Sequence, residues 1–325
     1  MRLLVGEYTI KVRSARVEYL FTIKRKFTFI TGDSGTGKTR FVAMIEDSKT
    51  NSRIKVSSEV PIRIYRDKDL LFEDMRDKNK QVIYLLDEAI CRILNNVDFA
   101  RIARDSEGYF VLVTRKPFEN IPYSALEIYN FSERKLGKKL IYSQVRQYYW
   151  KNDISVNAEY VLVEDSVVGY EFYKRTCNGV VKSANCNGNI EKLLLRLENS
   201  KYNHIFVVAD GAAFGSHVKK YMDVLEKTSK DIRLFCPESF EYLVLASGIV
   251  RVDKDKLINT QDYADSVKFF SWERYYTYLL EQCTKPYGGY KKNAKKYPKF
   301  LDNDVAVKKM YDVIGEIKNV TFMDR

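Results

Sequence analysis

The sequence has few of the residues on which several kinds of catalytic site depend. Only two of its 325 residues are histidines, His204 and His217, so a Ser-His-Asp triad and histidine-based nuclease chemistry are poorly supported. The five cysteines are an odd number without C-x-x-C spacing, which fits a reducing compartment better than a disulfide framework. Any hydrolysis of nucleic acid by this chain would therefore have to use carboxylates and a metal ion.

Long apolar runs are also missing. No run approaches the ~20 apolar residues that a membrane span requires, and the first residues lack a secretory pattern, so we expect a cytoplasmic protein without a membrane partner. The length of 325 residues and the hydrophobic content of 45% suggest two globular domains. The net charge of +12 favours a polyanionic partner, DNA or RNA. Basic clusters occur at residues 24–26, 134–139 and 291–296, although each could equally be a solvated surface.

The most specific motif is GDSGTGKT at residues 32–39, which meets the spacing G-x-x-x-x-G-K-[ST] in full. It follows the apolar run 27–30 and precedes the segment 40–45, so it predicts a strand, a glycine-rich loop and a helix. In that context, backbone N–H groups face a phosphate chain at a helix N-terminus. Lys38 would reach the β- and γ-phosphates of ATP, and the Thr39 hydroxyl would bind Mg²⁺. The predicted nucleotide-binding residues of the loop are Gly32, Asp33, Ser34, Gly35, Thr36, Gly37, Lys38 and Thr39.

Two carboxylates follow the apolar run at residues 82–86. Such a run predicts a parallel strand buried on both faces, and the carboxyl end of that strand is where a doubly wound sheet binds its ligand. Asp87 is the candidate Walker B acid beside Mg²⁺, and Glu88 is the candidate catalytic residue that orients or deprotonates the attacking water. Because a glutamate directly follows the aspartate, ATP hydrolysis is favoured over the phosphoryl transfer of a small nucleotide kinase.

A further predicted strand at residues 109–113 ends in Thr114 and Arg115. Thr114 is a candidate sensor of the γ-phosphate or a simple strand cap. Arg115 could act as an arginine finger, in cis or across an oligomer interface, or could face solvent.

The first domain is expected to cover residues 1–150, with a boundary near residues 152–153. Only about fifty residues separate the two phosphate-site motifs and no S-G-G-Q-like signature lies between them, which is short for an ABC-type ATPase. The sequence therefore predicts a compact P-loop ATPase sheet. Alternating residues at 3–12 and 16–24 predict a β-hairpin, expected as a flap beside the strand that leads into the phosphate loop.

The second half, residues 151–325, alternates between strand and helix patterns and predicts a parallel α/β sheet. The polar stretch between Cys177 and Cys186 is expected to be a surface loop. The tail from residue 271 is expected to be helical, and its aromatic residues and lysines could either clamp a nucleic acid or belong to a docked helix pair. The expected strands cover residues 159–163, 204–209 and 232–236, and the expected helices cover residues 167–175, 190–200 and 212–227.

Each of these three strands is followed by acidic residues. The shared carboxyl edge of the sheet would gather Glu164, Asp165, Asp210, Glu238 and Glu241. Carboxylates brought together are costly unless a cation neutralises them, so the sequence predicts a site for Mg²⁺ or Mn²⁺. Such an ion can activate water and stabilise the leaving oxygen of a phosphodiester.

The segments VLVEDSVVGYEFY, IFVVADGAAFG and CPESFEYLVLA resemble the successive acidic strand ends of the toprim fold. The order, with an ATPase first, is similar to that of the overcoming-lysogenisation-defect-like ATPase–toprim proteins of bacterial anti-phage defence. The resemblance covers roughly residues 156–250 and implies that Glu164 and Asp210 are catalytic and bind metal. Ala212 stands where the family has the second acid of its D-x-D pair, so Glu238 or Glu241 would have to replace that ligand. The compact first domain departs from the family too, because the family's ATPases are of ABC type.

These features predict an ATPase whose cycle controls a metal-dependent toprim-like nuclease, in anti-phage defence or in a mobile element. The alternative is a regulatory or scaffolding ATPase whose toprim-like domain is catalytically degenerate and binds nucleic acid or a partner protein. A motor or packaging ATPase is a further alternative, and the acids could also be incidental to a structural α/β domain. P-loop ATPases often complete their sites across subunits, so resemblance to them implies a homo-oligomer.

Overall fold

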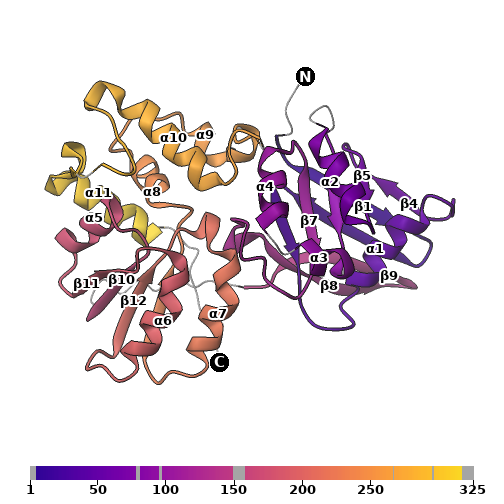
Figure 1. Ribbon diagram of the computed structural model, residues 1–325, viewed down its shortest axis with the longest axis horizontal. Coiled ribbons are helices and arrows are strands. Elements are labelled where there is room, and N and C mark those ends of the chain that lie inside the picture. The colour runs from indigo at the N-terminus through magenta and orange to yellow at the C-terminus, as the bar shows by residue number, and fades with distance from the viewer. Residues whose placement is uncertain are drawn as a thin grey trace. The chain divides into compact units, whose positions relative to one another are not determined.

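The computed structural model describes residues 5–77, 81–94, 97–148, 158–265, 267–294 and 296–316. The chain forms two compact units (Figure 1). The first contains the described residues up to 148 together with residues 259–271, and the second contains the other described residues. Residues 259–271 lie within the second of the two domains expected from the sequence. The boundary expected near residues 152–153 lies outside the described residues.

A nine-stranded sheet forms the first unit, in the order β4-β1-β2-β9-β8-β3-β7-β6-β5. The strands from β8 through β3, β7 and β6 to β5 pair in parallel, whereas β4 with β1, β1 with β2, and β8 with β9 pair antiparallel. The strands are β1 (Tyr8–Arg13), β2 (Val17–Ile23), β3 (Phe27–Ile30), β4 (Lys55–Ser57), β5 (Ile62–Ile64), β6 (Ile83–Leu86), β7 (Tyr109–Val113), β8 (Ile128–Leu136) and β9 (Lys139–Arg146).

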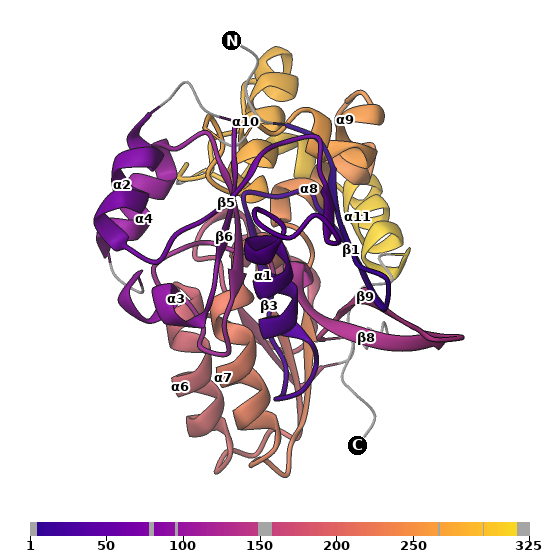
Figure 2. The same cartoon turned by 90° about the vertical axis from the view of Figure 1, so that its right-hand side faces the viewer.

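Helices cover the parallel part of this sheet, whose strands β3, β6 and β7 consist entirely of buried residues. Figure 2 shows α2, α3 and α4 on one side of β5 and β6. The start of α2 follows from local chemistry, because the Asp67 carboxylate accepts hydrogen bonds from the backbone N–H groups of Asp69 and Leu70. The helices are α1 (Lys38–Asp47), α2 (Lys68–Arg76), α3 (Glu88–Leu94) and α4 (Val97–Asp105).

The predicted hairpin of β1 and β2 is confirmed, but its expected place beside the strand of the phosphate loop is wrong. Strands β9 and β8 lie between β2 and β3 in the sheet. Strands β8 and β9 were not expected from the sequence; β8 is buried only at its start, and its last five residues are all exposed, so it lacks the regular alternation of a half-buried strand. Strand β9 pairs in parallel with β2 and buries Tyr142 against Tyr19 with a ring separation of 4.5 Å.

The second unit contains a four-stranded parallel sheet in the order β11-β10-β12-β13. The expected alternation of strands and helices is confirmed. The expectation of a surface loop between Cys177 and Cys186 is wrong in part, because a short strand there adds to the edge of the sheet. The strands are β10 (Tyr160–Val163), β11 (Val180–Ser183), β12 (His204–Val208) and β13 (Asp231–Phe235).

The tail contributes two helices that pack on α8. Tyr275 and Tyr276 of α10 are buried, and the ring of Tyr276 lies 4.9 Å from that of Tyr242 in α8, as expected for docked helices. Over the described residues the chain is therefore mixed α/β, and none of its helices there is long and apolar enough to cross a membrane. The helices of this unit are α5 (Val168–Thr176), α6 (Asn187–Leu197), α7 (Gly215–Leu225), α8 (Phe240–Ala246), α9 (Asp255–Ile258), α10 (Trp272–Thr284) and α11 (Asp304–Glu316).

Candidate nucleotide-binding site and acidic cluster

The predicted phosphate-binding loop connects β3 to α1, and Gly37 is its last residue before the helix. Gly37 has a φ of 88°, in the left-handed region that favours glycine. An added Cβ atom there would lie 2.9 Å from both the Tyr19 hydroxyl and the ring of Tyr142. The Tyr19 hydroxyl also donates a hydrogen bond to the Gly37 carbonyl at 2.9 Å. Two aromatic side chains, one from β2 and one from β9, therefore fix the path of the loop where it enters the helix.

Lys38 is buried, with 8% of its surface exposed, and its ammonium lies inside the loop. The Nζ atom donates to the carbonyls of Gly32 at 2.8 Å and Asp33 at 2.6 Å, and to the Thr36 hydroxyl at 2.8 Å. Burial and the nearby charge of Arg115 lower the pKa of Lys38. The loop oxygens offset part of the free-energy cost of burying the charged ammonium. An anionic ligand would offset this cost further, because it would add negative charge beside the ammonium.

A cavity of about 630 Å³ opens beside the loop, a size within the range of small-molecule sites. It lies where the ends of β6 and β7 meet the start of α1, so residues far apart in the sequence share it. The predicted site residues that line this cavity are Lys38, Thr39, Asp87, Glu88 and Arg115.

Asp87 and Glu88 are both held by backbone donors at the end of β6. Asp87 Oδ1 accepts hydrogen bonds from the backbone N–H groups of Ala89 at 3.1 Å and Ile90 at 3.2 Å, which caps the start of α3. Glu88 Oε2 accepts a hydrogen bond from the backbone N–H of Arg115 at 3.1 Å. The two carboxylates are thus oriented before any ligand enters.

Arg66 is a residue of this cavity that sequence reasoning missed. Its guanidinium forms an ion pair with Asp87 and a two-point contact with Glu46 of α1, at 3.1 Å from Nε to Oε1 and 2.6 Å from Nη2 to Oε2. Arg66 lies in the loop between β5 and α2, outside any motif, and only the folded sheet brings it to the end of β6. No pattern in the sequence could have identified it.

Thr114 and Arg115 differ in their surroundings. Thr114 is buried and its hydroxyl accepts a hydrogen bond from the backbone N–H of Lys116 at 3.2 Å, which is the local turn contact of a strand cap. Arg115 lines the cavity and its Nη2 atom donates to the Ser34 hydroxyl of the phosphate loop at 2.9 Å. Arg115 is therefore the better placed of the two for contact with a bound phosphate.

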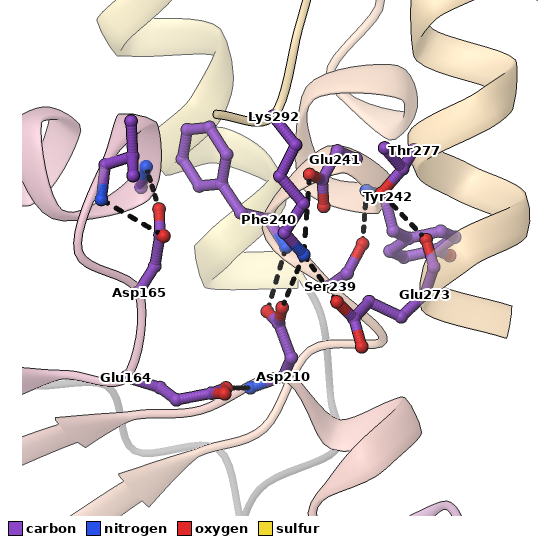
Figure 3. Close-up of polar contacts among 12 residues, drawn as sticks. Glu164, Asp165, Asp210, Ser239, Phe240, Glu241, Tyr242, Glu273, Thr277 and Lys292 are labelled. Carbon is purple, nitrogen blue, oxygen red and sulfur yellow. Dashed lines mark hydrogen bonds and ion pairs between the residues drawn. The ribbon is translucent and has the colours of Figure 1, made fainter. Parts of the chain in front are cut away.

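Acidic side chains also gather in the second unit, at the carboxyl ends of β10 and β12 (Figure 3). Glu164 Oε2 accepts a hydrogen bond from the backbone N–H of Asp210 at 2.9 Å, and Asp210 Oδ1 accepts one from the backbone N–H of Phe240 at 3.2 Å. Glu241 of α8 and Glu273 of α10 complete what we call the acidic cluster: Glu164, Asp210, Glu241 and Glu273.

A lysine is the cation that faces this cluster. Lys292 Nζ lies 3.7 Å from Asp210 Oδ2 and 3.8 Å from Glu241 Oε1, and it forms an ion pair with Glu273 (Figure 3). Burial works against the charged form of Lys292, but the surrounding carboxylates outweigh it and raise its pKa. Lys292 therefore supplies positive charge where the sequence analysis expected a metal ion.

Burial raises the pKa of each carboxyl at the centre of the cluster. The pKa of Glu164 rises to about 7, mainly because of burial and with a contribution from the charge of Glu273. Burial and the charge of Glu164 raise the pKa of Asp210, opposed by Lys292. Glu241 is 1% exposed, so burial raises its pKa as well; its Oε1 atom accepts a hydrogen bond from the Tyr290 hydroxyl at 3.0 Å, whereas Oε2 has no hydrogen-bond partner among the residues that the structure describes.

Asp165 and Glu238 were also expected at this edge. The Asp165 carboxylate accepts hydrogen bonds from the backbone N–H groups of residues 166, 167 and 169 at the start of α5 (Figure 3). It also lines the same small pocket as Glu164 and Asp210, and its charge contributes to the raised pKa of Glu164. At Glu238 the backbone carbonyl accepts a hydrogen bond from the N–H of Ala212 at 3.1 Å, which joins the two strand ends through the main chain.

The two sites differ in how well they fit a divalent ion. In the first unit, Thr39 and Asp87 line one cavity beside Lys38, so a hydroxyl and a carboxylate could hold Mg²⁺ there once the ion replaces Arg66 as the partner of Asp87. In the second unit, the arrangement described does not fit the predicted metal, because Lys292 faces the oxygens of Asp210 and Glu241. Over the described residues, no group of three or more His, Cys, Asp or Glu side chains has an arrangement that could hold a metal ion.

The fold thus brings together the predicted residues around Lys38 in one unit and Glu164 with Asp210 in the other. Glu273 and Lys292 join the second group from the C-terminal tail, where the sequence pattern gave no signal for an acidic site. The chain matches no family model, and no curated protein is significantly similar to it in sequence.

Proposed function

We propose that the first unit binds a nucleoside triphosphate with Mg²⁺ and hydrolyses it, with ATP as the nucleotide to test first. The proposal is supported above all by the cavity that Lys38, Thr39, Asp87 and Glu88 share at the phosphate loop. These side chains come from the start of α1 and from the end of β6 where α3 begins, and they combine a cation suited to phosphate with a hydroxyl and two carboxylates.

In this proposal, the backbone N–H groups of the loop and the ammonium of Lys38 bind the phosphates. Lys38 would exchange its present acceptors, the loop carbonyls, for phosphate oxygens. Thr39 and Asp87 would hold Mg²⁺, which neutralises charge on the phosphate oxygens when bound. Glu88 would orient the attacking water and accept its proton, and Arg115 would stabilise charge on the γ-phosphate.

For the second unit, the position of Lys292 favours the regulatory interpretation over the nuclease. A lysine that faces Asp210, Glu241 and Glu273 provides one internal positive charge beside these carboxyl groups. We therefore propose an ATPase whose catalytically degenerate toprim-like domain binds nucleic acid or a partner protein, in anti-phage defence or a mobile element. A homo-oligomer remains part of the proposal, because Arg115 could act on a neighbouring subunit.

Phosphate release from ATP in the presence of Mg²⁺ tests the first part. Lys38→Ala and Glu88→Gln should each lower the rate by about 100-fold or more, because each removes a group that acts on the transferred phosphate or the attacking water. Lys49→Ala, an exposed lysine just beyond α1, is the matched control and should leave the rate unchanged. Equal rates in Lys38→Ala and Lys49→Ala would reject the proposed site.

The second part is tested with labelled DNA, RNA and tRNA in Mg²⁺ or Mn²⁺, with and without ATP. The regulatory interpretation requires that no substrate be cleaved while ATP hydrolysis is intact. Metal-dependent cleavage that is lost in Glu164→Ala would establish the nuclease instead, and its response to Lys38→Ala would show whether ATP controls it.

A further inference from the structure

One face of the antiparallel part of the first sheet carries mostly cations. Side chains alternate between the two faces of a strand, and the inward residues of β1 and β2, such as Val12 and Tyr19, are fully buried. The residues between them point to the opposite face. There, the outward side chains of β4, β1, β2, β9 and β8 include five cations and one acid. We call the five cations the basic face: Lys11, Arg13, Lys55, Arg134 and Lys139.

The strand register shows how these cations are spaced. Lys55 pairs with Arg13, Arg13 with Glu18, Glu18 with Ile141, and Ile141 with Arg134. This single cross-strand row spans four strand spacings, or roughly 19 Å at about 4.8 Å each. The arginines and lysines therefore spread across the full width of five strands.

Glu18, the one acid on this face, is already neutralised. Its carboxylate lies 3.4 Å from Lys11 Nζ and 2.5 Å from Lys139 Nζ, and only 17% of its side chain is exposed. The hydrogen bond from Lys139 and the charges of both lysines lower the pKa of Glu18, which keeps it ionised. Because Glu18 offsets only one of the two lysine charges, the face retains a net positive charge, to which the exposed side chains of Arg13, Lys55 and Arg134 contribute most directly.

The remaining outward residues indicate how a polyanion would be contacted. Five of them carry hydroxyl groups, which together with lysine and arginine are the usual donors to phosphate oxygens, and the others are Leu20, Ile128, Asn130, Leu136, Ile141 and Val145. None of the outward residues in these strands, all of which the structure describes, is aromatic, so the face lacks the stacking platforms of single-strand binders. The hydroxyl residues are Thr9, Thr22, Ser57, Ser132 and Ser143.

We propose that the basic face binds the phosphate backbone of a double-stranded nucleic acid. The contacts would be electrostatic and independent of base sequence, because the face offers charge and hydroxyl groups over a broad surface. The same strands also reach the phosphate loop, since Tyr19 follows Glu18 in β2 and its hydroxyl binds Gly37 on the opposite face. A duplex bound to the basic face would therefore contact the strands that hold the nucleotide loop.

The experiment measures binding of the full chain to a labelled duplex of about 20 base pairs by fluorescence anisotropy, without nucleotide, over a range of salt concentrations. The test variant is Arg13→Gln/Lys55→Gln/Arg134→Gln. The control variant is Lys182→Gln/Lys192→Gln/Lys227→Gln, which removes the same charge from exposed positions in the second unit. Because nucleotide is absent, failure of the proposed ATPase would not affect this result.

The test variant should bind at least about tenfold more weakly than wild type, with the slope of log affinity against log salt shallower by about 2 to 3. The control variant should bind as wild type. Equal binding by the test variant, stronger binding to a single strand of the same length, or binding to poly-glutamate but not to a duplex would each overturn the proposal. Should the triple variant fail to fold, Lys55→Glu alone, at an exposed edge-strand position, must still weaken binding and Lys182→Glu must not. Duplex DNA and duplex RNA are compared in parallel to identify the nucleic acid.

Discussion

The guanidinium of Arg66 forms an ion pair with the carboxylate of Asp87, the residue proposed to hold Mg²⁺. The same guanidinium also binds Glu46, so Arg66 links the end of β6 to α1. A divalent ion that binds Asp87 has to replace Arg66 as the partner of this carboxylate. Arg66 would therefore compete with the proposed Mg²⁺ for Asp87.

Arg66→Gln should lower the Mg²⁺ concentration required for half-maximal ATP hydrolysis. Both partners are partly exposed, so the ion pair is worth about 0.2–1 kcal/mol and the expected change is at most about fivefold. The measurement is a Mg²⁺ titration at fixed ATP. Arg101→Gln, which removes an exposed surface pair with Asp98, is the control. A higher Mg²⁺ requirement in Arg66→Gln would mean that Arg66 contacts the nucleotide phosphates itself.

Gly37→Ala should destabilise the first unit more than Gly137→Ala does. Both glycines have positive φ, 88° and 59°, so an alanine at either position costs about 1–2 kcal/mol of backbone strain. At Gly37 the added Cβ would also lie 2.9 Å from Tyr19 and Tyr142, whereas at Gly137 nothing lies within 4 Å. Denaturant unfolding of the two variants measures the difference. Equal losses would show that the aromatic pair moves aside freely.

Glu164 should make the stability of the second unit depend on pH. Its pKa is raised to about 7 from the model-compound value of 4.5, so the folded state holds a proton more tightly than the unfolded state does. Stability should therefore fall as the pH rises from about 4.5 to about 7. Glu164→Gln removes the titration and keeps an oxygen to accept the hydrogen bond from Asp210.

This variant should be more stable than wild type at pH 8, by on the order of 1–3 kcal/mol, with a smaller difference at pH 5. Denaturant unfolding at both pH values in metal-free buffer measures this. Glu226→Gln, at an exposed position after α7, should show no such difference between the two pH values. A Glu164→Gln variant that loses stability at pH 8 would show that the carboxylate is stabilised by charge in the folded protein.

The sequence predicted those parts of the sites that depend on local pattern. Lys38 belongs to a loop that the spacing of its residues alone identifies. Asp87 follows an apolar run that predicts a buried strand, and a ligand site is expected at the carboxyl end of such a strand. Arg66 and Lys292 could not be predicted, because each lies in a loop and reaches its carboxylate partners only through tertiary structure. The role of Asp165 could not be predicted either. An acid after a strand can belong to an acidic site or accept hydrogen bonds at the start of a helix, and only the structure shows that Asp165 accepts such hydrogen bonds.

Lys292→Met should destabilise the second unit at pH 8, because it leaves Asp210, Glu241 and Glu273 without the cation that faces them. Lys292 is one third exposed, so water screens part of the loss and the expected cost is about 1–3 kcal/mol. The loss should be smaller at pH 5, since the raised pKa values of Asp210 and Glu241 allow these groups to become neutral.

Thermal unfolding of Lys292→Met with and without Mg²⁺ or Mn²⁺ tests whether the acidic cluster can bind a divalent cation in place of the lysine. Lys291→Met, at the exposed neighbouring position, is the control for loss of charge in the same loop. If Lys292 is the counterion of the cluster, a divalent ion should raise the unfolding temperature of Lys292→Met but not that of Lys291→Met. The double variant Lys292→Met/Glu241→Gln should regain part of the stability, because it removes one buried carboxylate together with its lost partner. Equal stability of the Lys291 and Lys292 variants would instead show that the cluster is neutralised by protonation, which assigns the raised pKa of Asp210 to burial alone.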